Sequence, residues 1–177
     1  MMSDTGATAW PEQLTGRWTL DVQRTRVAFR LKKLGFIRVA GTLPVAGGTL
    51  DCAPGGRPVR LEVRMAAAGF TTGNPQRDRA VRGRGVLDAE GHPEITFTAG
   101  SAEPDGDSWR VTGELTVRGV SAPQVLTVEA ADPAPTGEPR FRATAVVDRT
   151  AVGVTALRGI AGRLVEVEIE AVLSPAP

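Results

Sequence analysis

Apolar and polar residues alternate with a period of two along most of the chain. The clearest run is residues 59–65, where four apolar residues alternate with Arg60, Glu62 and Arg64. This period places successive side chains on opposite faces of a β-strand. Similar runs occur at residues 17–21, 27–32, 36–45, 94–99, 110–118, 125–131, 140–147 and 165–171. The pattern predicts an all-β domain of antiparallel strands, each with one buried and one solvated face.

The alternation fails in two places. Residues 71–83 read Thr-Thr-Gly-Asn-Pro-Gln-Arg-Asp-Arg-Ala-Val-Arg-Gly, which predicts a turn followed by a short helix between two halves of the sheet. Residues 148–162 form a second irregular stretch before the last strand. We predict a flexible tail over residues 1–15 and a single domain over residues 16–174.

Two packed sheets and a closed barrel would both produce this alternation. Small residues such as Gly113, Ala143 and Ala145 lie on otherwise apolar faces, and aromatic residues make up only 5% of the chain. An eight-stranded barrel has room for one ligand when its inward side chains are small. The residues alone leave a ligand-holding cavity and a filled core equally open.

Composition narrows the classes of function. The chain has 177 residues and a formal net charge of +1, which gives no electrostatic argument for binding nucleic acid or an acidic membrane surface. We predict neither nucleic-acid binding nor stable insertion into a membrane. Its only cysteine, Cys52, cannot form an intramolecular disulfide. No signal peptide and no membrane-spanning apolar run is evident, so we predict a cytoplasmic protein and leave a homodimer open.

Few residues suggest chemistry. His92 is the only histidine and lies in a predicted turn, and Cys52 has no neighbour in the sequence that would lower its pKa. We therefore predict no catalytic residue, no metal site and no cofactor. Carboxylates beside arginines more often form structural ion pairs than general bases. On this basis we expect structural ion pairs at Arg77, Asp78, Asp148 and Arg149.

Several ordered motifs together resemble the YceI-like family of lipocalin-like, polyisoprenoid-binding proteins. The match covers residues 17–173, practically the whole predicted domain. The motifs are Trp18-x-Leu-Asp21, Thr25-x-Val-x-Phe-x-Leu-Lys-x-Leu-Gly35, Val39-x-Gly41, Thr72-Gly-Asn-x-x-Arg-Asp78, His92-Pro-x-Ile-x-Phe97, Val111-Thr-Gly-x-Leu-Thr-x-Arg-Gly-Val120, Asp148-Arg149 with Gly153, and Val165-Glu-Val-Glu-Ile-Glu170.

The resemblance implies a lipocalin-like, antiparallel eight-stranded β-barrel with a short helical connection and an internal apolar cavity. The chain departs from the family pattern at several positions. Three family histidines are replaced, by Arg24, Lys33 and Arg79, and the usual bulky aromatics are Gly85 and Val86. The Phe-Gly pair that the family has near the last loop is Val152-Gly153.

The residue pattern and the resemblance together predict a non-enzymatic protein that binds, sequesters or transports a polyisoprenoid lipid or an isoprenoid quinone. An enzyme that uses the barrel as a reaction chamber and a stress-related interaction module are the alternatives. Residues expected to bind the ligand lie on inward strand faces or at the rim. They are Phe29, Leu31, Phe36, Leu61, Val63, Met65, Phe70, Phe97, Leu115, Val117, Phe141, Ala143, Ala145 and Val154.

Overall fold

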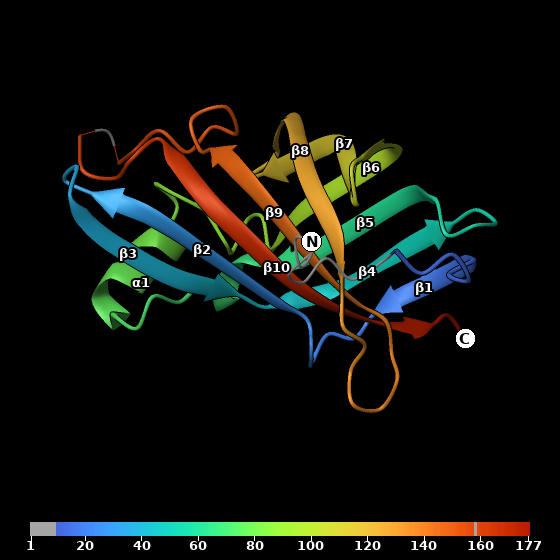
Figure 1. Ribbon diagram of the computed structural model, residues 1–177. Helices are drawn as coiled ribbons and strands as arrows, with labels where there is room; N and C mark the ends of the chain where they lie inside the picture. Colours follow the sequence, from blue (N-terminus) through green and yellow to red (C-terminus); the bar gives the residue numbers. More distant parts are fainter. Residues whose placement is uncertain (1–9, 158) are drawn as a thin grey trace.

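A computed structural model describes residues 10–157 and 159–177, and β-strands dominate it (Figure 1). The strands are β1 (Gly16–Leu20), β2 (Arg26–Lys33), β3 (Ile37–Leu43), β4 (Val45–Cys52), β5 (Pro58–Ala66), β6 (Glu94–Asp105), β7 (Ser108–Val117), β8 (Val120–Ala131), β9 (Arg140–Asp148) and β10 (Leu164–Pro175). A 3₁₀ turn, η1 (Ala67–Gly69), and a helix, α1 (Pro75–Arg82), lie between β5 and β6. No helix in these ranges is long and apolar enough to span a bilayer.

The strands close into an antiparallel barrel. The ring runs β1-β4-β5-β6-β7-β8-β9-β10, and β10 returns to pair with β1. Eight strands therefore form a closed circuit, which leaves no free sheet edge within it. The predicted all-β class, the eight-stranded barrel and the short helical connection are confirmed.

The hairpin of β2 and β3 lies outside this circuit and extends it at one end. Strand β10 is shared: Leu173 lies opposite Leu20 of β1, and Glu170 lies opposite Arg26 of β2. Strands β1 and β2 thus pair with successive parts of β10, and both run antiparallel to it. Only Pro44 separates β3 from β4 along the chain. Strand β4 pairs with β5, whereas β3 pairs with β2 and not with β5, so the chain leaves β5 at Pro44. The barrel is therefore wider at the end that carries the hairpin.

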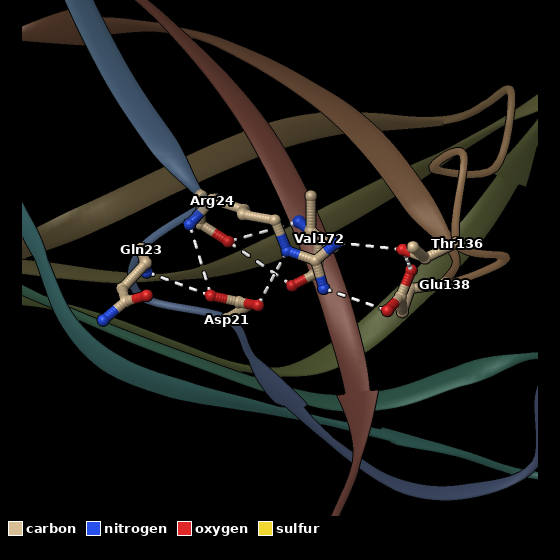
Figure 2. Close-up of polar contacts among 7 residues, drawn as sticks. Asp21, Gln23, Arg24, Thr136, Glu138 and Val172 are labelled. Carbon is tan, nitrogen blue, oxygen red and sulfur yellow. Dashed lines mark hydrogen bonds and ion pairs between the residues drawn. The ribbon is translucent and has the colours of Figure 1, made fainter.

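A polar cluster holds the passage from β1 to β2 (Figure 2). The Asp21 main chain donates to Val172 of β10, and its carboxylate accepts from Arg24 Nε at 2.8 Å. Arg24 also reaches Glu138 in the β8–β9 loop, with Nη2 3.1 Å from Oε1. Thr136 donates a further hydrogen bond to Glu138. Arg24 stands where the resemblance places a histidine, and its side chain links the β1–β2 turn to the β8–β9 loop.

The segment from η1 to α1 fills the gap beside β3. Thr42 of β3 and Thr71 exchange main-chain hydrogen bonds of 2.9 and 3.1 Å, so Thr71 partly replaces the strand that β3 lacks. A side chain at Gly41 would overlap the Thr71 carbonyl, so glycine is required for this approach. Helix α1 begins after Asn74, whose side chain accepts from the Arg77 N–H at 3.1 Å. Pro75 occupies its first turn, where its missing N–H costs nothing.

The N-terminal segment closes the opposite end of the barrel. Trp10 packs on Phe141, with ring centroids 4.7 Å apart, and its indole N–H donates to the Gly56 carbonyl at 2.7 Å. Leu14 is only 2% exposed. The side chains of Trp10 and Leu14, within the predicted tail of residues 1–15, therefore pack against the core. Residues 1–9 of that tail lie outside the described residues.

The cluster in Figure 2 makes a prediction about pH. Hydrogen bonds from Arg24 and then Thr136 lower the pKa of the Glu138 carboxyl to about 2. A lowered pKa means that the ionised carboxylate is more stable in the folded state than in the unfolded state. The resulting stabilisation is complete above the unfolded pKa of about 4.3 and is lost as the pH falls toward 2. We expect a carboxyl ¹³C titration to give a midpoint near 2, and Arg24→Gln to move it back toward 4. A midpoint unchanged in Arg24→Gln would contradict this assignment.

Candidate functional site

An apolar cavity of about 340 Å³ lies at the wide end of the barrel. Its wall comes from the β2–β3 hairpin, strands β5 to β10, helix α1 and the β9–β10 connection. Such a volume is at the lower end of the range for small-molecule sites. Stacked rings of Phe29 and Phe70, with centroids 4.9 Å apart, join the hairpin to the segment that follows η1. The two elements thus form one continuous wall.

Ten of the residues expected to bind a ligand line this cavity. They are Phe29, Leu31, Val63, Met65, Phe70, Phe97, Leu115, Val117, Ala145 and Val154. Leu61, Phe141 and Ala143 instead line a smaller cavity of about 50 Å³ near Trp10, and Val63 contributes to both. Phe36 lines neither cavity, since it is 77% exposed at the tip of the hairpin.

Sequence reasoning missed part of the wall. Val165, Val167 and Ile169 of β10 line the cavity, and their alternation with glutamates was a usable signal. Val81 of α1 and Leu157 of the β9–β10 connection had no such signal. Their positions depend on how irregular segments fold back over the barrel, which no period in the sequence encodes.

The surface of the cavity is almost wholly apolar, and the few polar residues at its border include no Asp or Glu. They are Lys33, Thr72, Arg77, Gln124 and Arg149. The polar part of the wall is therefore neutral or cationic. Such a wall suits an amphiphile with a polar or anionic head better than it suits a cation.

Asp78 anchors α1, although not through the expected ion pair. The carboxylate is 3% exposed and accepts from the Thr72 N–H at 3.0 Å and from the Thr71 hydroxyl at 3.2 Å. Burial alone would raise the pKa of Asp78, but hydrogen bonds from Thr72 and Thr71 and the charge of Arg82 hold it below its usual value. Arg77 Nε donates to the Thr72 hydroxyl at 2.8 Å, and that hydroxyl donates to Asp78. The two residues thus share Thr72 instead of pairing directly.

Arg149 holds the irregular stretch that precedes β10. Its guanidinium is 8% exposed and donates to the main-chain carbonyls of Val154, Ala161 and Gly162 at 2.6, 2.8 and 2.9 Å. Its neighbour Asp148 instead accepts from Thr150 and lies 3.7 Å from Arg163. The expected pairing within Asp148–Arg149 is replaced by these contacts, because the two side chains leave β9 on opposite faces.

The remaining candidates for chemistry lie outside the cavity. His92 is exposed in the turn before β6 and is not part of the wall. Burial, and then the charge of Asp51, raises the pKa of the Cys52 thiol to about 11, so the thiol is protonated at neutral pH. In the described part of the chain, no three His, Cys, Asp or Glu side chains gather where they could hold a metal ion.

Comparisons with known proteins agree with this geometry. The family model described as the YceI-like domain matches residues 18–173. Protein YceI of Escherichia coli is 32% identical over 107 residues, covering 59% of this chain and 55% of that protein. UPF0312 protein plu2095 of Photorhabdus laumondii is 27% identical over 121 residues, covering 66% of this chain and 62% of that protein. The matches thus span little more than half the length of these relatives.

Solved structures share the fold at low sequence identity. BcnA of Burkholderia cenocepacia superposes with a TM-score of 0.76 at 20% identity, covering 88% of this chain and 99% of that one. A polyisoprenoid binding domain from Saccharophagus degradans, implicated in plant cell wall breakdown, gives a TM-score of 0.67 at 14% identity. That comparison covers 90% of this chain and 98% of the domain.

The Asp78 contacts predict that Asp78→Ala loosens the cavity end of the molecule. Without the carboxylate, the buried Thr72 N–H loses its acceptor and the segment that completes β3 is released. We expect a fall in melting temperature of several degrees and faster amide exchange in residues 70–82, measured by hydrogen exchange. Asp88→Ala, in the loop after α1, is the control. Equal exchange rates in the two variants would show that Asp78 does not anchor the segment.

The Arg149 contacts predict that Arg149→Lys is destabilising although it keeps the charge. Lysine cannot reproduce the planar fork of donors, so buried carbonyls of the β9–β10 connection lose their partners. We expect a loss of about 3 kcal/mol in urea denaturation, because each unsatisfied buried group costs about 1–3 kcal/mol. Arg142→Lys is the matched control on β9, since its ion pair with Glu168 is exposed. The control should change stability by less than about 1 kcal/mol. Equal losses in both variants would contradict the role given to Arg149.

Proposed function

Because the chain belongs to the YceI-like family, with residues 18–173 matched, we propose that it binds an isoprenoid lipid or quinone in the cavity of its barrel. The observation that carries the proposal is the apolar cavity at the wide end, walled by ten of the side chains expected to bind such a ligand. The likeness to a polyisoprenoid binding domain supports the same class of ligand. The role is non-enzymatic: the protein sequesters or carries the ligand. A cytoplasmic location stays a prediction from the sequence.

The energetics of such a site come from the apolar chain of the ligand. Each buried CH₂ group contributes about 0.8 kcal/mol, so a chain of a few isoprene units needs little polar help. Ala145 and Val154 leave space between larger residues such as Phe29 and Phe97. This arrangement favours a flexible, branched chain over a rigid planar ligand.

The polar residues of the wall give the ligand an orientation. Lys33, on the hairpin, and Arg77, on α1, line the cavity together with Thr72. We place the polar or anionic head of the ligand between the hairpin and α1, with its chain directed toward Leu115 and Leu126. In this orientation the head group stays near solvent and the chain is buried.

Two β9 substitutions test the proposal directly. Ala145→Phe fills the cavity, whereas Val146→Phe places the same side chain on the outer face, where Val146 is 56% exposed. We expect Ala145→Phe to weaken uptake of a polyprenol or quinone about tenfold or more, since overpacking costs about 1–3 kcal/mol. Val146→Phe should match the wild type.

The readouts are mass spectrometry of lipids extracted from the purified protein and of geranylgeraniol or a short-chain quinone retained after incubation and gel filtration. Melting curves verify that both variants fold. A wild-type barrel that neither retains nor takes up an isoprenoid chain would refute the proposal. Equal uptake by both variants would place the ligand outside this cavity.

A further inference from the structure

The wide end of the barrel carries a protruding apolar surface that the binding of a ligand in the cavity does not explain. Leu34, Phe36 and Ile37 form the tip of the β2–β3 hairpin and are 51%, 77% and 42% exposed. Ile160 of the β9–β10 connection is 48% exposed, and its carbonyl accepts from the Leu34 N–H at 2.7 Å. These four residues are called the apolar tip below.

Main-chain contacts fix the apolar tip in place. The Gly162 N–H donates to the Lys32 carbonyl at 2.7 Å, and Lys33 bridges to Ala161. The hairpin and the connection therefore present their apolar side chains as one unit, at the end of the molecule where α1 also lies (Figure 1). Lys33, Ile160 and Ala161 also line the cavity, so the apolar tip borders its wall.

Cations flank the apolar tip without nearby carboxylates on the same segments. Lys32 and Arg38 are both exposed and lie directly opposite each other across β2 and β3. Like charges in a cross-strand pair are destabilising unless an anion compensates them. Residues 22–50 contain no Asp or Glu, and neither do residues 149–165. At the opposite end, the β6–β7 region carries Glu103, Asp105 and Asp107, all exposed.

We propose that the apolar tip docks on the surface of an anionic lipid bilayer and brings the cavity to the membrane. An exposed apolar tip with flanking Lys and Arg is the combination that binds at the interface between head groups and acyl chains. Phe36, Leu34 and Ile37 enter this interface, while Lys32 and Arg38 contact lipid phosphates. Each such cation contributes about 1 kcal/mol at an anionic surface.

A bilayer fits these features better than a protein partner does. A stable protein interface buries about 800 Å² on each partner, and four partly exposed side chains provide far less. The turn between β2 and β3 lies at one extreme end of the molecule (Figure 1). A fluid bilayer can accept a convex tip and supply anions around it at the same time.

Vesicle flotation tests the electrostatic part of the proposal. Wild-type protein should float with vesicles that contain phosphatidylglycerol, bind weakly to phosphatidylcholine alone, and be released by raising the salt concentration. Lys32→Glu combined with Arg38→Glu should weaken binding to the anionic vesicles by at least about thirtyfold. Arg57→Glu combined with Arg110→Glu changes the net charge equally at the far end, and should leave binding within about twofold of the wild type.

A second pair of variants tests the contribution of apolar side chains to vesicle binding. Phe36→Ser should weaken vesicle binding about tenfold or more, whereas Val22→Ser, at an exposed site in the β1–β2 turn, should not. Melting curves verify the fold of each variant. Absence of vesicle binding by the wild type, or equal losses in the matched variants, would overturn the proposal. Concentration-dependent dimerisation that requires Phe36, without flotation, would assign the apolar tip to a second copy and also overturn it.

Different variants test the docking proposal and the ligand proposal, so either one can be contradicted without the other. Ala145→Phe fills the cavity but leaves the apolar tip intact, so it should keep full vesicle binding. The variant with Lys32→Glu and Arg38→Glu should still take up geranylgeraniol supplied in detergent, because neither side chain lines the cavity.

Discussion

The divergence of β3 from β5 at Pro44 sets the position of every element at the wide end of the barrel. A strand that leaves its neighbour exposes main-chain N–H and C=O groups that need new partners. Thr71 supplies them to Thr42, and the Asp78 carboxylate holds Thr71 and Thr72 in place. The segment that leads into helix α1 therefore pairs with the edge of β3, which lies outside the closed ring. The cavity exists because this closure uses a loop and a helix instead of another strand.

The two ends of the barrel consequently differ in character. At the narrow end, strands β1 and β10 pair directly and Trp10 packs over Phe141, which leaves only a small cavity there. At the wide end, irregular segments form the wall and are held by single buried polar groups. Arg149 donates to four main-chain carbonyls of the β9–β10 connection.

The β2–β3 hairpin and the β6–β7 turn also differ in the charged residues that they carry. The formal net charge of +1 suggested a surface without electrostatic character, yet the β2–β3 hairpin carries cations without Asp or Glu, and the β6–β7 turn carries exposed carboxylates. Cations of the β2–β3 hairpin, such as Lys32 and Arg38, lie at the wide end, and Asp105 and Asp107 lie at the narrow end. A net charge averages over such a separation, whereas a nearby anionic surface responds only to the charges within about 10 Å of it.

The pattern of the sequence by itself determined the all-β class, the helical connection and part of the apolar wall, whereas the eight-stranded barrel was implied by the resemblance to the YceI-like family. It could do so because a period of two fixes which side chains share a face, wherever the strand lies. Only the tertiary structure decided that Asp78 binds Thr72, that Arg149 binds carbonyls, and that Phe36 lies outside the cavity. These outcomes depend on how irregular segments cross the barrel and on which distant residues they meet. Local periodicity carries no information about either.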